Sequence, residues 1–190
     1  MNKKEIITLG GLPGSGKSTV KAILAEHFRW NAFSTGDFMR QTALARGLSF
    51  DEFNALIATD KSLDEEIDAK LIDIEKTHNK VIVDSHLAFH FVPSSFKVFL
   101  NISLETSAKR IFKDSERTSR KSVGDTMGSV EEAKKRIESR ISNHNDRYMR
   151  FYGVSPYNRE QYDLVVETEQ HSPTAVAEII IEAYQNWLTK

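Results

Sequence analysis

The residues best suited to chemistry lie near the start of the chain, in the run Gly11-Leu12-Pro13-Gly14-Ser15-Gly16-Lys17-Ser18. The run has the spacing G-x-x-x-x-G-K-S and follows an apolar segment. Glycines here permit positive φ angles and let main-chain N–H groups turn toward an anion, which bulkier residues would block. Lys17 would reach the terminal phosphates of a nucleotide, and the Ser18 hydroxyl would ligate Mg²⁺. The run therefore predicts a phosphate-binding loop.

The residues after this loop favour the same interpretation. Residues 17–28 have the apolar spacing of a helix, and its positive N-terminal end would face the bound anion. We expect ATP and Mg²⁺ as cofactors. The residues expected to hold ATP are Gly11, Pro13, Gly14, Ser15, Gly16, Lys17, Ser18 and Thr19. The alternative is a glycine-rich turn that only reverses the chain.

A carboxylate further along the chain is a second candidate metal ligand. Asp84 ends the apolar run Val81-Ile82-Val83, which places it at the carboxyl edge of a buried strand. Ligands of open α/β sheets bind at that edge. Because P-loop enzymes hold the metal with the loop Ser or Thr and such an Asp, Ser18 and Asp84 are the expected metal residues. The alternative is a strand-end Asp that caps the following turn.

The segment Phe33-Ser34-Thr35-Gly36-Asp37-Phe38-Met39-Arg40 ends the second expected strand and opens a helix. Thr35 or Asp37 would cap that helix. Arg40 would then lie one turn inside it, close enough to the mouth of the sheet to bind a second phosphate through two parallel hydrogen bonds. The alternative is an arginine on the solvated side of a helix.

Basic side chains are frequent in the second half of the chain. Among them are Lys109, Arg110, Arg117, Arg120, Lys121, Arg136, Arg140, Arg147 and Arg150. Three of them, Arg136, Arg140 and Arg147, have helical spacings that keep them on one face. Phosphoryl transfer between two anions needs such groups, because the transition state spreads charge over the oxygens of the moving phosphoryl. The alternative is a charged, solvated helix face balanced by acidic neighbours.

The elements that position these residues alternate between short β-branched runs and longer helical patterns. The expected strands are residues 5–10, 31–34, 80–84, 96–101 and 163–167. The expected helices are residues 17–28, 37–46, 49–59, 63–77, 104–113, 129–151 and 174–188. This order predicts an α/β fold with a five-stranded parallel sheet covered by helices on both faces. Ser49 and Glu52 form a capping box at the start of the third helix.

Composition limits the class of protein. A chain of 190 residues predicts one domain of ordinary size, and its net charge of -1 argues against a broad nucleic-acid surface. The chain has no cysteine, which excludes disulfides and thiolate sites. No apolar run approaches membrane-spanning length. We therefore expect a cytoplasmic monomer with no nucleic-acid or membrane partner. Residues 114–129, rich in Ser, Thr and Gly among charges, are expected to form a mobile loop.

Together these segments resemble the nucleoside monophosphate kinases. The S-T-G-D-x-x-R segment that ends in Arg40 is similar to that of adenylate kinases, whose Arg holds the acceptor phosphate. The compact archaeal-type cytidylate kinases are more similar still, and the likeness extends from Ile6 to about Ala183. The further shared segments are Arg46-Gly47-Leu48-Ser49, the stretch with Arg140, Arg147, Tyr148, Tyr152 and Gly153, and Tyr162-Asp163-Leu164-Val165-Val166.

The resemblance implies a three-layer α/β/α P-loop kinase domain over residues 1–190. Residues 37–77 would form the helices that bind the acceptor nucleotide, and about residues 113–130 a short lid. The substrate-binding residues would be Thr35, Asp37, Arg40 and His86. The catalytic residues would be Lys17, Arg110, Arg117, Arg140 and Arg147. In two respects the chain departs from the family: His86 stands where an Arg usually grips the nucleotide phosphate, and the loop at residues 114–129 is longer.

Three hypotheses for function follow. The first is an ATP-dependent nucleoside monophosphate kinase that acts on CMP or dCMP. The second is a kinase of small metabolites with a hydroxyl acceptor, for which Asp37 would serve as the base. The third is a protein that binds ATP as a switch and transfers nothing. In the first, no general base is required because the acceptor phosphate is already an anion at neutral pH.

Overall fold

A parallel sheet forms the centre of the molecule in the computed structural model, which describes residues 4–57, 60–115 and 128–189. Its strands are β1 (Ile6–Gly11), β2 (Asn31–Ser34), β3 (Val81–Asp84), β4 (Phe96–Asn101) and β5 (Leu164–Glu167). They lie in the order β2-β3-β1-β4-β5, and every pairing is parallel. The predicted α/β class, the number of strands and their parallel arrangement are confirmed.

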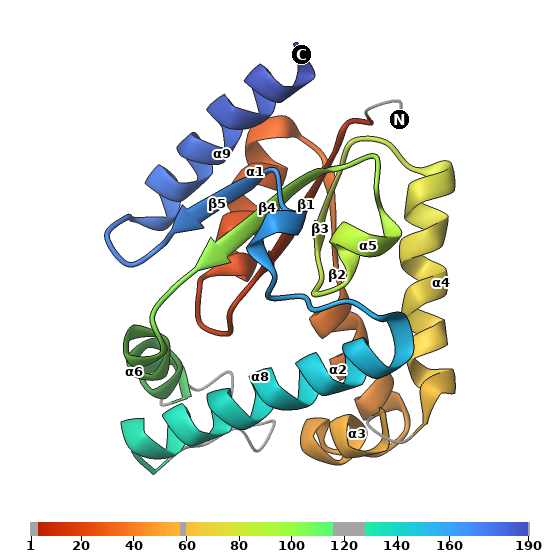
Figure 1. Cartoon of the computed structure of the whole chain (residues 1–190), viewed down its shortest axis with the longest axis vertical. Helices are drawn as coiled ribbons and strands as arrows, with labels where there is room; N and C mark the ends of the chain where they lie inside the picture. The colour runs from red at the N-terminus through yellow and green to blue at the C-terminus, as the bar shows by residue number, and fades with distance from the viewer. Residues whose placement is uncertain (1–3, 58–59, 116–127, 190) are drawn as a thin grey trace.

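Helices cover both faces of this sheet, as Figure 1 shows. The helices are α1 (Lys17–Phe28), α2 (Thr35–Ala45), α3 (Phe50–Ile57), α4 (Lys61–Thr77), α5 (Ala88–Phe91), α6 (Leu104–Ser115), α8 (Val130–Tyr152) and α9 (Pro173–Leu188), with a 3₁₀ turn at Arg159–Gln161. Helices α1 and α9 pack together on one face. Helices α4 and α5 pack on the other.

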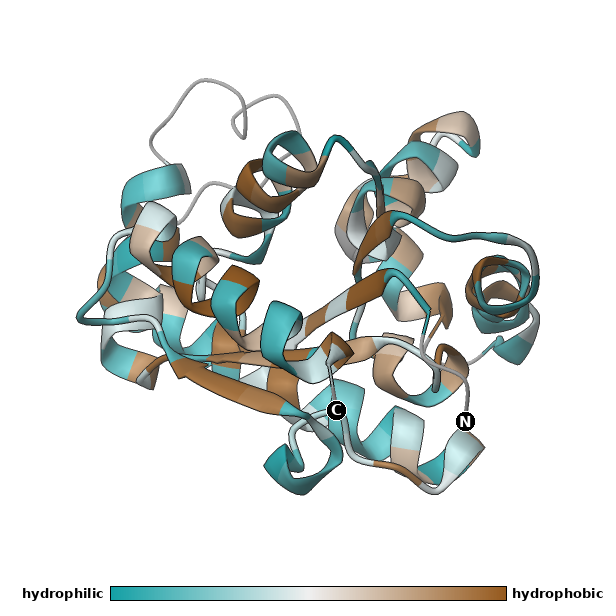
Figure 2. Cartoon of the chain, turned by 90° about the horizontal axis from the view of Figure 1, so that it is seen from above, coloured by the Kyte–Doolittle hydropathy of each residue, from teal (hydrophilic) through white to brown (hydrophobic). Residues whose placement is uncertain are grey.

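The core follows from the alternation of side chains along the central strand β1. Ile7 and Leu9 are fully buried against α1 and α9, whereas Ile6 is buried against α4 and α5. Successive strand residues point to opposite faces, so a strand covered on both sides requires a mainly apolar run. The hydropathy colouring of Figure 2 shows apolar strands in the middle and, around them, helices in which apolar and polar residues are mixed.

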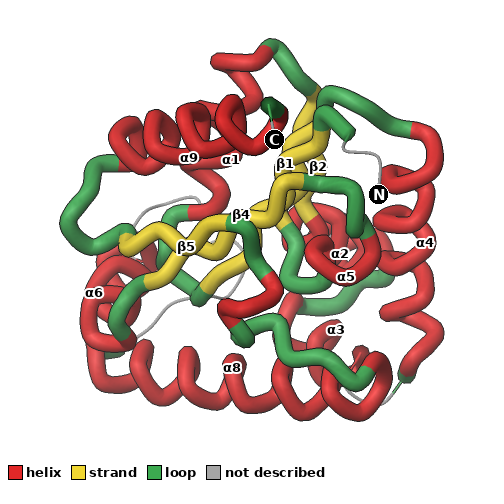
Figure 3. Tube along the Cα trace, turned by 45° about the horizontal axis from the view of Figure 1, so that its top comes forward, coloured by secondary structure: helices red, strands yellow, loops and turns green. Residues whose placement is uncertain are grey.

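Helix α8 runs across the carboxyl edge of the sheet. Its first half packs on α6 through Ala133 and Ile137, and its last turns reach the α4 side, where Tyr148 joins the core. Figures 1 and 3 both show this helix spanning from α6 to α3. The hydroxyl of Tyr152 donates to Asp68 of α4 at 2.6 Å. The helix therefore closes one side of the space beyond the strand ends.

Helix boundaries depart from the predictions where a cap was misassigned. We expected Thr35 or Asp37 to cap α2, but Ser34 does so, since its Oγ accepts from the Asp37 N–H at 3.3 Å. The helix consequently begins two residues earlier than predicted. The capping box of α3 is confirmed: Ser49 Oγ accepts from the Glu52 N–H at 3.2 Å, and Glu52 accepts from the Ser49 N–H at 2.8 Å.

Some predictions fall partly outside the described residues. Arg117, Arg120 and Lys121, with most of the predicted lid, belong to the segment 116–127 that the structure does not describe. Among the residues it does describe, no helix has the length and apolar character needed to cross a membrane.

Candidate active site

The phosphate-binding loop joins β1 to α1, and its backbone needs glycine at both ends. Gly11 has φ +135°, and a Cβ there would collide with the carbonyl oxygen of Leu100 on β4. Gly16 has φ +91° and stands at the N-cap of α1, which no described side chain caps. The first N–H groups of α1 therefore remain available to an anion, with the positive end of the helix dipole behind them.

A neighbouring helix holds the loop in place. Ser107 of α6 donates its hydroxyl hydrogen to the Pro13 carbonyl at 2.7 Å, and the Leu12 N–H donates to the Leu100 carbonyl at 3.2 Å. Ser15, at the centre of the loop, is buried and its hydroxyl has no hydrogen-bond partner among the described residues. A buried polar atom of this kind marks a place where a ligand can complete the hydrogen bonding.

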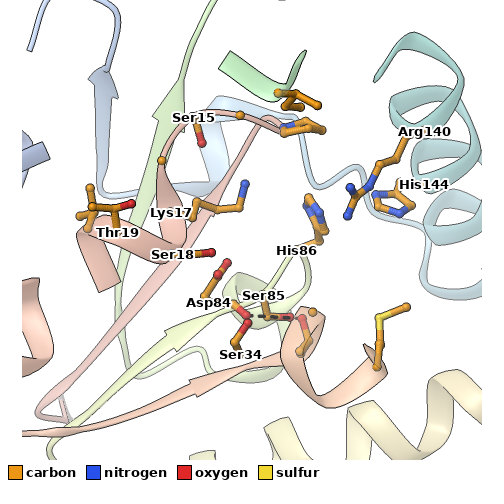
Figure 4. Close-up of a pocket in the computed structure, with 18 of the residues that line it drawn as sticks. Ser15, Lys17, Ser18, Thr19, Ser34, Asp84, Ser85, His86, Arg140 and His144 are labelled. Carbon is orange, nitrogen blue, oxygen red and sulfur yellow. Dashed lines mark hydrogen bonds between the residues drawn. The ribbon is translucent and has the colours of Figure 1, made fainter. Parts of the chain in front are cut away.

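Lys17 lies under this loop. Its Nζ donates to the carbonyls of Gly11 at 3.0 Å and Leu12 at 2.9 Å. Burial lowers the pKa of Lys17 to about 8, because the charged form loses hydration; the carboxylate of Asp84 opposes this shift and Arg140 adds to it. Figure 4 shows Lys17, Ser18 and Asp84 directed toward the same space.

Asp84 and Ser18 provide the oxygen ligands that a magnesium ion prefers. Asp84 ends β3 and is 8% exposed. Burial raises its pKa, and nearby Lys17 counteracts the rise. A hydroxyl and a carboxylate beside a phosphate-binding loop form a hard-oxygen donor set, which fits Mg²⁺ and leaves positions for phosphate oxygens and water. The two residues expected to hold the metal are thus brought to one wall of the cleft.

Arg40 also lines this cleft, together with Thr35. The guanidinium of Arg40 pairs with Asp37 at 2.7 Å, and Lys21 of α1 pairs with the other oxygen of Asp37 at 3.1 Å. Burial opposes ionisation of Asp37, but the hydrogen bonds from Arg40 and Lys21 outweigh it and hold its pKa below the ordinary value. Asp37 itself is not among the described residues that line the cleft. Its contact with Arg40 positions that guanidinium, and a direct contact of Asp37 with substrate stays a prediction.

Two histidines meet between β3 and α8. The rings of His86 and His144 lie 4.7 Å apart, and His144 Nδ1 is 3.4 Å from the Tyr157 hydroxyl. Burial holds the pKa of each well below the ordinary value, so both are neutral at pH 7. His86 Nδ1 is buried without a hydrogen-bond partner among the described residues. Figure 4 shows His86 facing His144 and Arg140 of α8.

The remaining predicted arginines lie at two ends of the cleft. Arg110 of α6 donates to the Thr168 carbonyl after β5 at 2.9 Å, beside His171 and Pro173. Arg147 of α8 lies at the other end, with its Nε 3.5 Å from Asp64. Arg136 belongs to the same helix but pairs with Glu132 on the exposed side. The cleft that joins these groups has a volume of about 520 Å³, enough for small ligands.

Sequence reasoning did not identify several residues of the cleft. His144, Asp64, Phe50 and Asn54 line it together with the predicted residues. For His144 a signal existed: it follows Arg140 by four residues and precedes Arg147 by three, which places all three on one helix face. For Asp64 no local signal exists, because its burial depends on α8 packing over α4.

A five-stranded parallel sheet with a phosphate-binding loop and cationic groups around a cleft at its carboxyl edge defines a P-loop nucleotide-binding protein. Comparison with known proteins narrows this class. The sequence pattern of the family described as AAA domain matches residues 10–134.

Curated relatives align over nearly the whole chain. A cytidylate kinase from Methanosarcina barkeri is 32% identical over 177 residues, which cover 92% of this chain and 93% of that protein. An S-adenosylmethionine-dependent nucleotide dehydratase from Lacinutrix mariniflava is 36% identical over 183 residues, 96% of this chain but only 36% of that protein. The chain thus spans about a third of the length of that relative.

Among solved structures, shikimate kinase from Acinetobacter baumannii superposes with a TM-score of 0.64 at 16% identity, covering 98% of this chain and 96% of that one. At this identity the likeness supports the fold alone. With the family pattern and the cytidylate kinases, these findings show that the chain belongs to the P-loop nucleoside monophosphate kinases. It is therefore a phosphotransferase, as the sequence predicted.

Proposed function

We propose that this protein transfers the terminal phosphoryl group of ATP to CMP or dCMP. The observation that carries the proposal is a single cleft that joins the phosphate-binding loop to a second cationic site at Arg40. The chain is similar to cytidylate kinases over nearly all of its residues, and this similarity supports the choice of a cytidine nucleotide.

The donor phosphates would bind to the N–H groups between Gly14 and Thr19. Lys17 would leave the loop carbonyls and contact the terminal phosphates. Ser18 and Asp84 would hold Mg²⁺, directly or through water, and the bound metal would neutralise charge on the donor phosphates. The wall formed by Arg110, Thr168 and His171 would then accept the nucleoside of the donor.

The acceptor phosphate would lie between Arg40 and His86. A neutral imidazole offers one donor where guanidinium offers several, so Arg40 would carry most of this contact. Arg140, which Figure 4 shows directed toward His86, would offset charge at the transferred group. The rate would come from alignment and electrostatics, because the acceptor is already ionised. Arg117 would contribute from the lid.

The two rival hypotheses receive less support. A hydroxyl acceptor would need a free carboxylate base, but Asp37, the candidate, is held by Arg40 and Lys21. A switch without transfer would not need acceptor-side groups such as Arg40 and His86 in the same cleft as the loop.

The decisive experiment is an assay of ADP release with MgATP against CMP, dCMP, UMP, AMP, GMP and dTMP, with shikimate and simple sugars as hydroxyl acceptors. Lys17→Ala is the control and should lose turnover by several orders of magnitude while remaining folded. Turnover on a hydroxyl acceptor alone would refute the proposal, and near-normal turnover by Lys17→Ala would refute the role given to Lys17.

The likeness to part of the Lacinutrix dehydratase supports a second proposal about the product. We propose that the phosphorylated nucleotide is a precursor of the substrate of a nucleotide dehydratase. The test supplies such a dehydratase with CMP, ATP, S-adenosylmethionine and a second kinase for the diphosphate, with and without this protein. Dehydrated product that forms only when this protein is present supports the proposal, and equal yields refute it.

A further inference from the structure

The cleft has an end that differs in chemistry from the phosphate sites. Helices α2, α3, α4 and α8 form its walls, and its lining includes Met39, Phe50, Asn54, Asp64, Ile67 and Arg147. Half of these side chains, Met39, Phe50 and Ile67, are apolar or aromatic, which suits a flat ring, and the other half offer polar groups to its edge. Because Asp64 would repel a phosphate, the charged part of the acceptor belongs near Arg40, and its nucleoside extends toward this end.

Asp64 is a buried carboxylate whose hydrogen bonding the fold leaves incomplete. Its side chain is 4% exposed, and its Oδ2 makes no hydrogen bond with any residue that the structure describes. The nearest cation is the Nε of Arg147 at 3.5 Å, which likewise has no hydrogen-bond acceptor within the described chain. The same guanidinium donates to the Tyr148 hydroxyl at 2.8 Å, which fixes its plane. Buried polar groups without partners are costly, so a donor from a ligand is expected here.

The neighbouring carboxylate shows that this is not a general property of α4. Asp68 lies one turn further along the helix, is similarly buried and also lines the cleft. Its Oδ2 accepts a hydrogen bond from the Tyr152 hydroxyl at 2.6 Å. The fold therefore supplies a donor to Asp68 and leaves Asp64 with an ion pair of poor geometry.

Cytosine presents to such a pair the pattern that completes it. The base carries an amino donor next to a ring nitrogen and a carbonyl oxygen that both accept. Resting on the proposed function and extending it, we infer that Asp64 accepts a hydrogen bond from the 4-amino group of the acceptor cytosine, while Arg147 donates to the adjoining ring acceptors. This reassigns Arg147 from the transferred phosphoryl group to the base.

The same pair would reject uracil. Uracil carries a carbonyl oxygen in place of the amino group and an N–H in place of the ring acceptor, so it would set oxygen against Asp64 and a donor against Arg147. Adenine shares the amino donor and ring acceptor, but has a C–H where cytosine has its second acceptor. Asp64 and Arg147 would thus select cytosine over uracil: both side chains form hydrogen bonds with cytosine, whereas both stay buried and unpaired when uracil binds.

The test is Asp64→Asn, an exchange of nearly equal shape that gives uracil a possible donor. The kcat/KM values for CMP and UMP are measured in the wild type and the variant. We expect the preference for CMP over UMP to fall roughly 10- to 100-fold. The matched control is Asp68→Asn, whose amide oxygen still accepts from Tyr152; because that contact is kept, its preference for CMP over UMP should stay within about twofold of the wild type.

A change in the substrate tests the same contact without altering the fold. With the wild type, replacing CMP by the analogue that lacks the 4-amino group should lower kcat/KM about as much as Asp64→Asn lowers kcat/KM for CMP. For the analogue, Asp64→Asn should lower kcat/KM little further, because the contact is already absent. If Asp64 instead bound the ribose, the variant would change the CMP-to-dCMP ratio and leave the CMP-to-UMP ratio unaltered, which would overturn the inference. Equal losses on CMP and UMP would also overturn it. Wild-type protein that is inactive on both CMP and dCMP would refute the proposed function itself, and this outcome is read before any variant is tested.

Discussion

Three cations that line the cleft, Lys17, Arg40 and Arg147, are each held by a carboxylate or by carbonyls, and these partners determine where the charge is delivered. Lys17 contacts two loop carbonyls, Arg147 contacts Asp64, and Arg40 contacts Asp37. Long basic side chains have many rotamers, so a fixed partner reduces the entropy lost when a phosphate binds. Asp37 is the clearest example, because it lies outside the cleft lining yet orients an arginine within it.

The first prediction concerns this positioning role. Asp37→Asn removes the charge that holds Arg40, and the KM for the acceptor nucleotide should rise roughly two- to fivefold, the size of an exposed ion pair. We expect kcat to change less, since the amide oxygen can still accept from Arg40. Steady-state kinetics with the acceptor varied at saturating ATP measures both constants.

A matched control for this variant exists on the same side of the molecule. Arg46 and Glu66 form an ion pair of 3.1 Å with similar exposure, away from the cleft lining. Glu66→Gln should leave the KM for the acceptor unchanged. A rise in KM with Glu66→Gln, or an unchanged KM with Asp37→Asn, would contradict the role of Asp37.

The limits of prediction at this scale follow from the range of the interactions. The phosphate-binding loop could be predicted because its chemistry is contained in eight consecutive residues. Arg40 and Asp84 could be placed near it because each follows a strand, and parallel strands end at one edge. Asp64 could not be assigned, because its burial arises where α8 packs against residues far away in the sequence, whereas the helical spacing of His144 from Arg140 and Arg147 does point to the cleft.

At the scale of elements, local capping chemistry set most boundaries. Strands β2 and β4 and helix α1 have their predicted bounds, since apolar periodicity and the glycine loop define them. Helix α4 begins at Lys61 because Asp60 accepts from the Ser62 N–H at 2.9 Å, a cap that the sequence analysis did not recognise. The short helix α5 was not predicted, because four residues carry too little periodicity to distinguish a helix turn from a loop.

The second prediction tests the capping box of α3, which forms a wall of the acceptor end. Ser49→Ala removes the acceptor of the Glu52 N–H and should cost about 1 kcal/mol of unfolding free energy. For a chain of this length the melting temperature should fall by about 2 to 4 °C. Thermal denaturation followed by circular dichroism measures the shift.

Ser139→Ala provides the comparison, because Ser139 lies on the exposed side of α8 away from any cap. Alanine has the higher helix propensity, so this variant should melt at or slightly above the wild-type temperature. Equal melting temperatures for Ser49→Ala and Ser139→Ala would show that the capping box contributes nothing to stability.

At the scale of the whole molecule, the buried ionisable groups that line the cleft lower the stability of the folded protein. Burial raises the pKa values of Asp64, Asp68 and Asp84, against the opposing effects of Arg147, Tyr152 and Lys17. Burial also lowers the pKa of Lys17. In each case the folded protein disfavours a charged form that the unfolded chain hydrates freely. Such perturbed groups concentrate where a protein binds ligands or catalyses a reaction, and here all of them line one cleft.

The last prediction measures the cost in stability at Asp64. Burial raises the pKa of Asp64 from 3.8 to about 6; Arg147 opposes the rise, and Asp68 adds to it. Between these values the folded protein holds a proton that the unfolded chain has lost, so the free energy of unfolding falls as pH rises through that window. A loss of this kind matters because a domain has only about 5 to 15 kcal/mol of stability. Asp64→Asn cannot ionise and escapes this loss. In urea denaturation, the stability of Asp64→Asn relative to the wild type should therefore increase from pH 4 to pH 7. A difference in stability that stays constant over that range would mean that burial does not disfavour the charged form of the wild-type carboxylate. Bound CMP should reduce the gap at pH 7, because a hydrogen bond to the carboxylate stabilises the charged form only in the wild type.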